Sequence, residues 1–210
     1  MPIQNIAPNA VRAAKFTVKF KDIFHLKEFY RAMHEWMREY DWFSTETDGL
    51  NIEDGADHYE TLYLEKEGGG GDKEMWWWWR LQKLPTSNSY YKYHMDIDYH
   101  ILYMFPAEVV RDGKKLKVNK GEVEVKLWAY LQFDYKGEWS KHPILKMFNK
   151  VFPKRIFKNE IYESHKLELY REMYVLQAYI KKWFKLKRFL PYEEVTQFHP
   201  SWAYPEWKKE

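Results

Sequence analysis

The segment YYKYHMDIDYHILYMF, residues 90–105, alternates between apolar and polar side chains. Because successive side chains of a β-strand point to opposite faces, the alternation predicts one long antiparallel strand with an apolar and a polar face. The apolar face would carry Tyr91, Tyr93, Met95, Ile97, Tyr99, Ile101, Tyr103 and Phe105, and the polar face Lys92, His94, Asp96, Asp98 and His100. We expect the apolar face to be buried along its whole length.

Other parts of the chain repeat this two-residue period and predict the neighbouring strands. They are residues 15–20, 59–66, 75–84 and 123–135. A separate short hairpin is expected from residues 107–111 and 114–118, because Asp112-Gly113 suits a tight turn. A second turn is expected at residues 119–121, and the four glycines at 68–71 predict another hairpin tip. The strands would therefore follow one another as a meander.

Two segments have the three-and-four spacing of helices that bury one side. Residues 23–40 form the first, with Asp22 as the expected N-cap, and residues 159–188 form a longer one. A short helix is also expected over 144–152. The fold class is therefore α+β, an antiparallel sheet of about six or seven strands with both long helices packed on it. The domain would span residues 15–188, between an arm at 1–14 and an aromatic, proline-rich tail at 189–210.

Composition favours a folded core and removes several kinds of chemistry. Of the 210 residues, 45% are hydrophobic and 20% aromatic, which excludes disorder for most of the chain. Cysteine is absent, so disulfides, thiolate zinc sites and a cysteine nucleophile are excluded. The net charge of +3 does not require a polyanionic partner. No apolar run is long enough to span a bilayer, and we expect a cytoplasmic protein. Abundant Lys and Glu suggest a heat-adapted source.

The order strand, helix, antiparallel strands and long C-terminal helix resembles the helix-grip or START-like (SRPBCC) superfamily. Residues 122–131, residues 141–150 and the helix beginning near Glu160 carry the resemblance best. It implies a curved sheet that wraps the terminal helix around a space for an apolar ligand. The segments 121–126 and 134–139 are also similar to those of small archaeal proteins, a likeness that implies no function.

The leading functional hypothesis is a non-enzymatic binding module with an apolar pocket between the sheet and the C-terminal helix. An apolar small molecule is the expected ligand, and no cofactor is expected. The residues expected to line the pocket are Tyr93, Met95, Ile97, Tyr99, Leu127, Leu131, Met173 and Leu176.

Two other functions remain open. Alternation places Trp76, Trp78, Trp128 and Tyr130 on the face opposite the core, where they predict an interface. The protein would then be a structural subunit of a homo-oligomeric assembly, such as a viral or cell-surface particle. The other alternative is binding of nucleic acid or an anionic membrane surface through the basic region 141–188, which the acidic residues elsewhere disfavour.

Catalytic chemistry has weaker support in the sequence. His94, Asp96, Asp98 and His100 share one strand face, and alternate His and Asp residues can supply metal ligands. The four span too much length for one ion, and pairing with neighbouring charges explains them more simply. Ser140, His142 and His165 match no nucleophile motif. We therefore expect no metal site and no enzyme.

Overall fold

The computed structural model describes residues 10–44, 59–85, 90–111, 113–143, 145 and 161–186. Along the chain the elements are β1 (Ala10–Phe24), α1 (Leu26–Glu39), β2 (Phe43–Ser44), β3 (Glu60–Glu67), β4 (Lys73–Lys83), β5 (Tyr91–Arg111), β6 (Lys114–Phe133), α2 (Glu138–Lys141) and α4 (Ile161–Trp183). The arm expected over residues 1–14 was wrong for residues 10–14, which belong to β1 because they pair with β6. Residues 1–9 of that arm, most of the helix expected at 144–152 and the tail from residue 189 lie outside the described residues.

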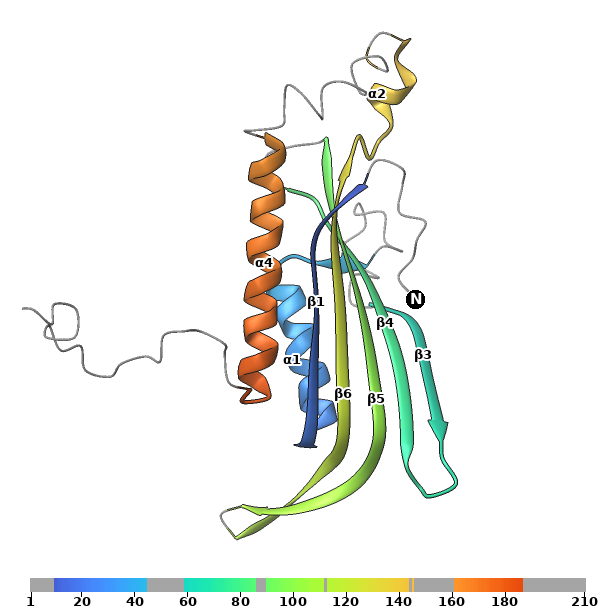
Figure 1. Ribbon diagram of the computed structural model, residues 1–210, viewed down its shortest axis with the longest axis vertical. Helices are drawn as coiled ribbons and strands as arrows, with labels where there is room; N and C mark the ends of the chain where they lie inside the picture. The colour runs from blue at the N-terminus through green and yellow to red at the C-terminus, as the bar shows by residue number, and fades with distance from the viewer. Residues whose placement is uncertain are drawn as a thin grey trace, which may run out of the picture.

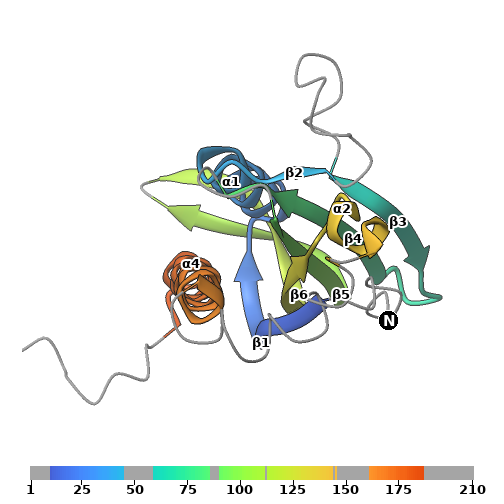
Figure 2. The ribbon, with the colours of Figure 1, turned by 90° about the horizontal axis from the view of Figure 1, so that it is seen from above.

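The six strands in the described part of the chain form one antiparallel sheet, which confirms the α+β class. The strand order is β1-β6-β5-β4-β2, and β3 also pairs with β4. Helices α1 and α4 both lie on the inner side of the curved sheet (Figures 1 and 2). The protein thus has two layers, and the sheet keeps an outer face that neither helix covers.

The core lies between the inner face and the helices. Across β5 and β6 the pairs Met95–Ala129, Ile97–Leu127 and Tyr99–Val125 stand opposite each other, and all six side chains are buried. Directly opposed apolar pairs are the main stabilising contacts of a sheet. The buried face of α4 adds Leu169, Met173, Leu176 and Ile180, and that of α1 adds Phe29, Met33, Trp36 and Met37.

Helix α1 starts later than its apolar pattern predicts. Strand β1 runs on to Phe24, and His25 is the N-cap, whose side chain accepts a hydrogen bond from the backbone N–H of Glu28 at 3.2 Å. The expected cap, Asp22, instead accepts from the neighbouring Ile23 N–H. That expectation was wrong because the alternation of β1 extends past Phe20 into the helical pattern.

The apolar face of β5 is buried only as far as Ile101. At that point Tyr103 and Met104 together oppose Gly121 of β6, which is a β-bulge, and Tyr103 has a φ of 51°. The extra residue reverses the faces, so Met104 is buried while Tyr103 and Phe105 are 65% and 42% exposed. The expectation of burial through Phe105 was therefore wrong at its last two positions.

Strands β5 and β6 form one long hairpin. The turn expected at residues 119–121 lies inside β6, because Asn119 and Lys120 continue the pairing with Pro106 and Phe105. What appears in the sequence as a separate short hairpin is the end of this longer one. Beyond the bulge the two strands leave the plane of the sheet and curve toward the side that carries the helices (Figures 1 and 2).

Candidate functional site

The eight residues expected to line a pocket are brought together by the fold. They lie between β5, β6 and α4, and each is at most 1% exposed. All eight belong to the continuous hydrophobic core. Their side chains occupy the interior, and none of them opens to solvent, so a ligand at this place would have to displace core side chains.

An open hollow of about 350 Å³ lies elsewhere on the inner face, between α1 and the β3–β4 hairpin. We call it the α1 hollow, and it is lined by Leu26, Lys27, Tyr30, Tyr63, Met75, Trp77 and Asn119. Tyr63 and Trp77 stand directly opposite each other on β3 and β4. The backbone N–H of Leu26 donates to Oδ1 of Asn119 at 3.3 Å, which ties the first turn of α1 to the sheet.

Aromatic rings make the walls of the α1 hollow firm. The Tyr30 ring meets Trp77 edge-on with centroids 6.2 Å apart, and Trp77 stacks on Tyr99 at 5.0 Å. Trp77 is 2% exposed, whereas Tyr63 is 56% exposed. The hollow therefore has a fixed inner wall and an accessible outer rim.

The polar groups of the α1 hollow are few. Lys27 is exposed, and Nε1 of Trp77 is buried with no hydrogen-bond partner among the described residues. Burial, and then the hydrogen bond that its hydroxyl donates to Glu65, raise the pKa of Tyr63. Apolar walls with a few polar groups are typical of small-molecule sites. The exposed Lys27 among apolar walls suits an apolar ligand that carries an anionic group.

The sequence did not reveal this hollow. Tyr30 and Trp77 read as ordinary core positions, and Asn119 as part of a turn. The available signal was Tyr63, a large ring on an edge strand whose neighbours in the two-residue alternation, Thr61 and Glu65, are polar.

A polar network joins α4 to β5 next to the closed core. The hydroxyl of Tyr93 lies 2.9 Å from Oε2 of Glu168 and 2.7 Å from Nδ1 of His165. Since a carboxylate only accepts, Tyr93 donates to Glu168 and accepts from His165, so the bonding pattern assigns a hydrogen to Nδ1. Burial, and then the hydrogen bond to Glu168, raise the pKa of Tyr93.

A second contact of α4 is an ion pair with an aromatic neighbour. Nζ of Lys83 lies 3.0 Å from Oε1 of Glu172, which also accepts from Nε1 of Trp42 at 2.6 Å. These bonds and the Tyr93 network fix α4 on the sheet. They serve the scaffold, because their side chains contact one another around the closed core rather than the α1 hollow.

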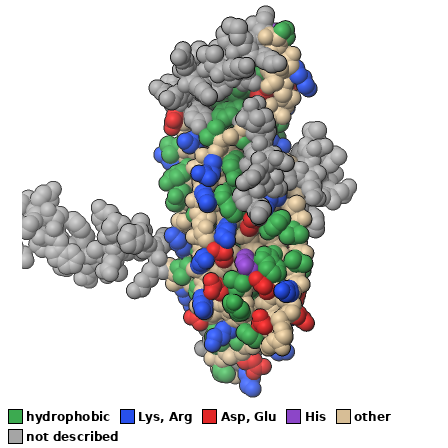
Figure 3. All heavy atoms as spheres, turned by 45° about the vertical axis from the view of Figure 1, so that its right-hand side comes forward, with side chains coloured by type: hydrophobic (Ala, Val, Ile, Leu, Met, Phe, Trp, Pro, Cys, Tyr) green, Lys and Arg blue, Asp and Glu red, His purple; other side chains and the backbone are tan. Residues whose placement is uncertain are grey.

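The outer face holds a buried ionic cluster. Arg80 is 2% exposed, and it donates to Oδ1 of Asp98 at 2.7 Å while its Nε lies 3.7 Å from Oδ1 of Asp96. Oδ2 of Asp96 is buried without a hydrogen-bond partner among the described residues. Burial raises the pKa of Asp96 to about 6, although the neighbouring Arg80 lowers it. Figure 3 shows acidic, basic and apolar side chains mixed on this side of the molecule.

The four residues expected at an interface surround this cluster. Trp76 stacks on His100 at 5.0 Å, and the Arg80 guanidinium lies 5.4 Å from the centre of the Trp78 ring. Trp128 is 7% exposed, and Tyr130 is partly buried. Contacts within the chain thus account for much of the burial of the tryptophan rings.

The four residues considered as metal ligands make other contacts. His94 bonds Gln132 at 2.6 Å, and His100 bonds Glu74 at 2.8 Å. Asp96 and Asp98 face Arg80. Within the described parts of the chain, no group of three or more His, Asp or Glu residues could hold a metal ion.

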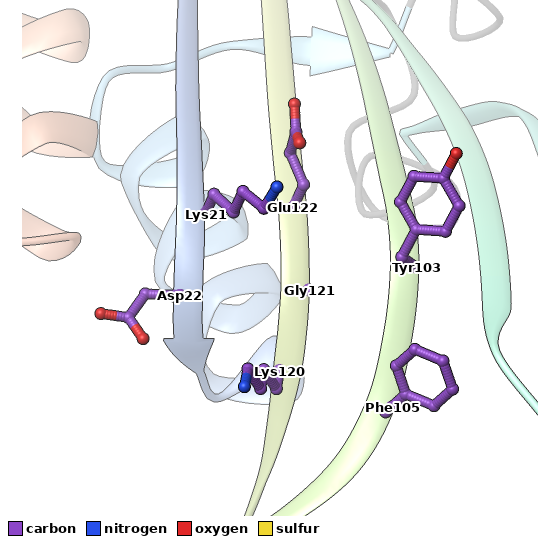
Figure 4. A pocket seen from close by; sticks show the side chains of 7 residues that line it. All are labelled: Lys21, Asp22, Tyr103, Phe105, Lys120, Gly121 and Glu122. Carbon is purple, nitrogen blue, oxygen red and sulfur yellow. The ribbon is translucent and has the colours of Figure 1, made fainter.

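A second hollow, of about 550 Å³, lies at the bend of the sheet. Tyr103 and Phe105 of β5 project beside Lys21 and Asp22 of β1 and Lys120, Gly121 and Glu122 of β6 (Figure 4). The positive charges of Lys21 and Lys120 equal in number the negative charges of Asp22 and Glu122 at this hollow. The β-bulge creates this hollow, since it turns the two rings outward.

The basic region 141–188 is only partly described. Lys141, Lys182 and Lys185 are exposed, and most of its remaining basic residues lie outside the described ranges. No helix in the described part of the chain is long and apolar enough to cross a membrane.

No protein-family model matches the chain, and no curated protein matches its sequence.

Proposed function

We propose that this protein is a non-enzymatic binding module that takes a small apolar ligand into the α1 hollow. The observation that carries the proposal is the aromatic wall of Tyr30, Tyr63 and Trp77 around about 350 Å³ of open space. The order of the elements, with both helices on the inner face of a curved sheet, supports a helix-grip-like ligand binder.

The ligand is expected to combine a ring or short chain with an anionic group. An apolar body would replace water against Met75 and the three rings, which is the main source of binding free energy for such sites. Lys27 at the rim would attract an anion. The closed core next to α4 supports the aromatic wall of the α1 hollow, because Tyr99 of the core stacks on Trp77.

Titration with 8-anilinonaphthalene-1-sulfonate tests the proposal, because this probe joins aromatic rings to one sulfonate. We expect saturable one-to-one binding to the folded protein by calorimetry. Leu26→Trp, which fills the hollow, should abolish it, and Lys27→Met should weaken it several-fold. Lys66→Met changes an exposed lysine on β3 and is the matched control. Equal affinity in all three variants would refute the proposal.

The assembly alternative keeps one supporting observation. Trp76, Trp78 and Tyr130 remain partly exposed on the outer face although the chain supplies contacts for them. Light scattering after size-exclusion chromatography tests it. A stable oligomer that the double variant Trp76→Thr/Trp78→Thr splits into folded monomers would favour assembly, and a monomer at high concentration would exclude it.

A further inference from the structure

The far end of the β5–β6 hairpin carries a local excess of positive charge. We call residues 105–120 the hairpin arm; it contains five Lys or Arg residues and two Asp or Glu residues. Its net charge is therefore +3. The overall charge hides this local excess.

The hairpin arm also exposes apolar side chains. Val110 is 66% exposed and Leu116 45%, both close to the turn at Gly113. Val110 pairs with Lys115 and Leu116 pairs with Val109, so the two exposed side chains stand on opposite faces of the ribbon. At the base of the arm, Phe105 is 42% exposed and pairs with Lys120.

The hairpin arm projects from the sheet and carries Val110 and Leu116 near its end. The strands curve out of the sheet at the β-bulge and run away from it toward Gly113 (Figures 1 and 2). Six paired positions, from Pro106–Asn119 to Arg111–Lys114, give a ribbon roughly 20 Å long. The pairing satisfies the backbone groups that face the other strand, while those on the two outer edges need water or headgroup partners, so the tip suits the headgroup boundary rather than the hydrocarbon interior.

We propose that the hairpin arm docks the protein on an anionic lipid surface. Val110 and Leu116 enter the boundary between headgroups and acyl chains, and the flanking Lys115 and Lys117 lie at the level of the anionic headgroups. Glu108 opposes Lys117 and reduces, but does not cancel, the positive charge.

The apolar tip favours a lipid surface over a nucleic acid. Lysines would serve either partner, but single-stranded nucleic acids are held by rings on which bases stack. At the tip, Val110 and Leu116 have no ring to stack on a base and no donor for a phosphate, and the exposed rings of Tyr103 and Phe105 lie at the base of the arm, roughly 20 Å away. Insertion of the tip into the lipid boundary explains why Val110 and Leu116 are exposed on opposite faces of a ribbon that also carries lysines. The proposal does not depend on the α1 hollow binding a ligand.

Co-sedimentation of the full chain with vesicles tests the proposal. We expect binding to vesicles of phosphatidylcholine with phosphatidylglycerol, little binding to phosphatidylcholine alone, and weaker binding at high salt. Lys115→Gln/Lys117→Gln should lower the partition coefficient at least tenfold, since each charge contributes roughly fivefold. Val110→Ser/Leu116→Ser should lower it by a similar factor at unchanged net charge. Leu64→Ser and Lys66→Gln on β3 are the controls and should bind as the parent does.

Three results would overturn the proposal. They are the absence of binding to anionic vesicles, equal binding by the parent and both double variants, and binding governed by the lysines alone. The last would point to a different polyanion. Anisotropy with labelled oligouridylate identifies that case, because RNA binding that needs Lys115 and Lys117 but tolerates Val110→Ser/Leu116→Ser would make nucleic acid the partner. Circular dichroism verifies that each variant is folded.

Discussion

Gly121 of β6 lies so close to Leu102 of β5 that a side chain at position 121 would meet backbone. A Cβ there would stand 2.9 Å from the carbonyl oxygen of Leu102 and 3.1 Å from that of Tyr103. The contact occurs at the β-bulge, where the sheet bends and the buried face of β5 changes. Glycine at this position therefore permits the bend that forms the hairpin arm.

Replacing Gly121 with alanine should destabilise the protein because the atoms it would strike cannot move without shifting the strands. We expect a loss of about 1 to 3 kcal/mol in the free energy of unfolding, measured by urea denaturation. Gly69→Ala is the matched control, since a Cβ there meets nothing within 4 Å. Equal stability of the two variants would show that the close approach does not shape the bend.

Shortening Ile97 should leave a cavity in the core. Ile97 is fully buried opposite Leu127, and Ile97→Ala should cost about 2 to 5 kcal/mol. Leu64→Ala removes a similar volume from a side chain that is 52% exposed on β3, and it should cost far less. Urea denaturation of both compares them directly. Similar losses would contradict the assignment of the inner and outer positions.

Removing the charge of Asp96 should change how stability depends on pH. The pKa of Asp96 is raised from its ordinary value of 3.8 to about 6 in the folded chain, so the folded state holds the proton more tightly. Stability from this group is therefore present below pH 3.8 and is lost as the pH rises through 6. Asp96→Asn should remove this loss. The free energy of unfolding of the variant, relative to that of the parent, should therefore be roughly 2 to 3 kcal/mol more favourable at pH 7 than at pH 4.

Urea denaturation of the parent and Asp96→Asn at pH 4 and pH 7 measures that difference. Asp22→Asn changes an exposed carboxyl and is the control. A difference between parent and Asp96→Asn that stays constant over this range would show that Asp96 ionises in the folded chain as it does in the unfolded one.

Removing the Tyr93 hydroxyl should loosen α4. The hydroxyl bridges His165 and Glu168, and its loss leaves Nδ1 of His165 with only Glu168, 3.6 Å away. We expect Tyr93→Phe to cost about 1 kcal/mol. Tyr103→Phe alters a ring that is 65% exposed and should be neutral. Thermal unfolding monitored by circular dichroism compares them, and an unchanged melting temperature in Tyr93→Phe would argue against the network.

Alternation and helical spacing were enough to predict the class of the fold. They placed the odd-numbered residues from Tyr93 to Ile101 on the inner face of the sheet and Asp96 and Asp98 on its outer face. The reason is that a face buried against helices must be apolar at every second residue. They could not reveal the bulge, since Tyr103 and Phe105 continue the alternation in the sequence. The reversal depends on Gly121, which lies on another strand and is set by the pairing register.

The candidate site was harder to predict for a related reason. The residues expected to line a pocket are apolar and mutually adjacent, but the same properties let them close into a core. The open space depends on where α1 crosses the sheet, and the helical period does not give that position. Lys27, Tyr63 and Asn119 meet only because α1, β3 and β6 converge there.

The most direct test of the α1 hollow is the indole N–H spectrum of the folded protein. Neighbouring residues of β4 supply an internal control, because Trp77 lines the hollow while Trp76 and Trp78 lie on the outer face. We predict that titration with 8-anilinonaphthalene-1-sulfonate shifts the ¹H–¹⁵N indole signal of Trp77, assigned with Trp77→Phe, and leaves those of Trp76 and Trp78 in place. Saturable binding that shifts Trp76 or Trp78 and leaves Trp77 unmoved would contradict a ligand site on the inner face.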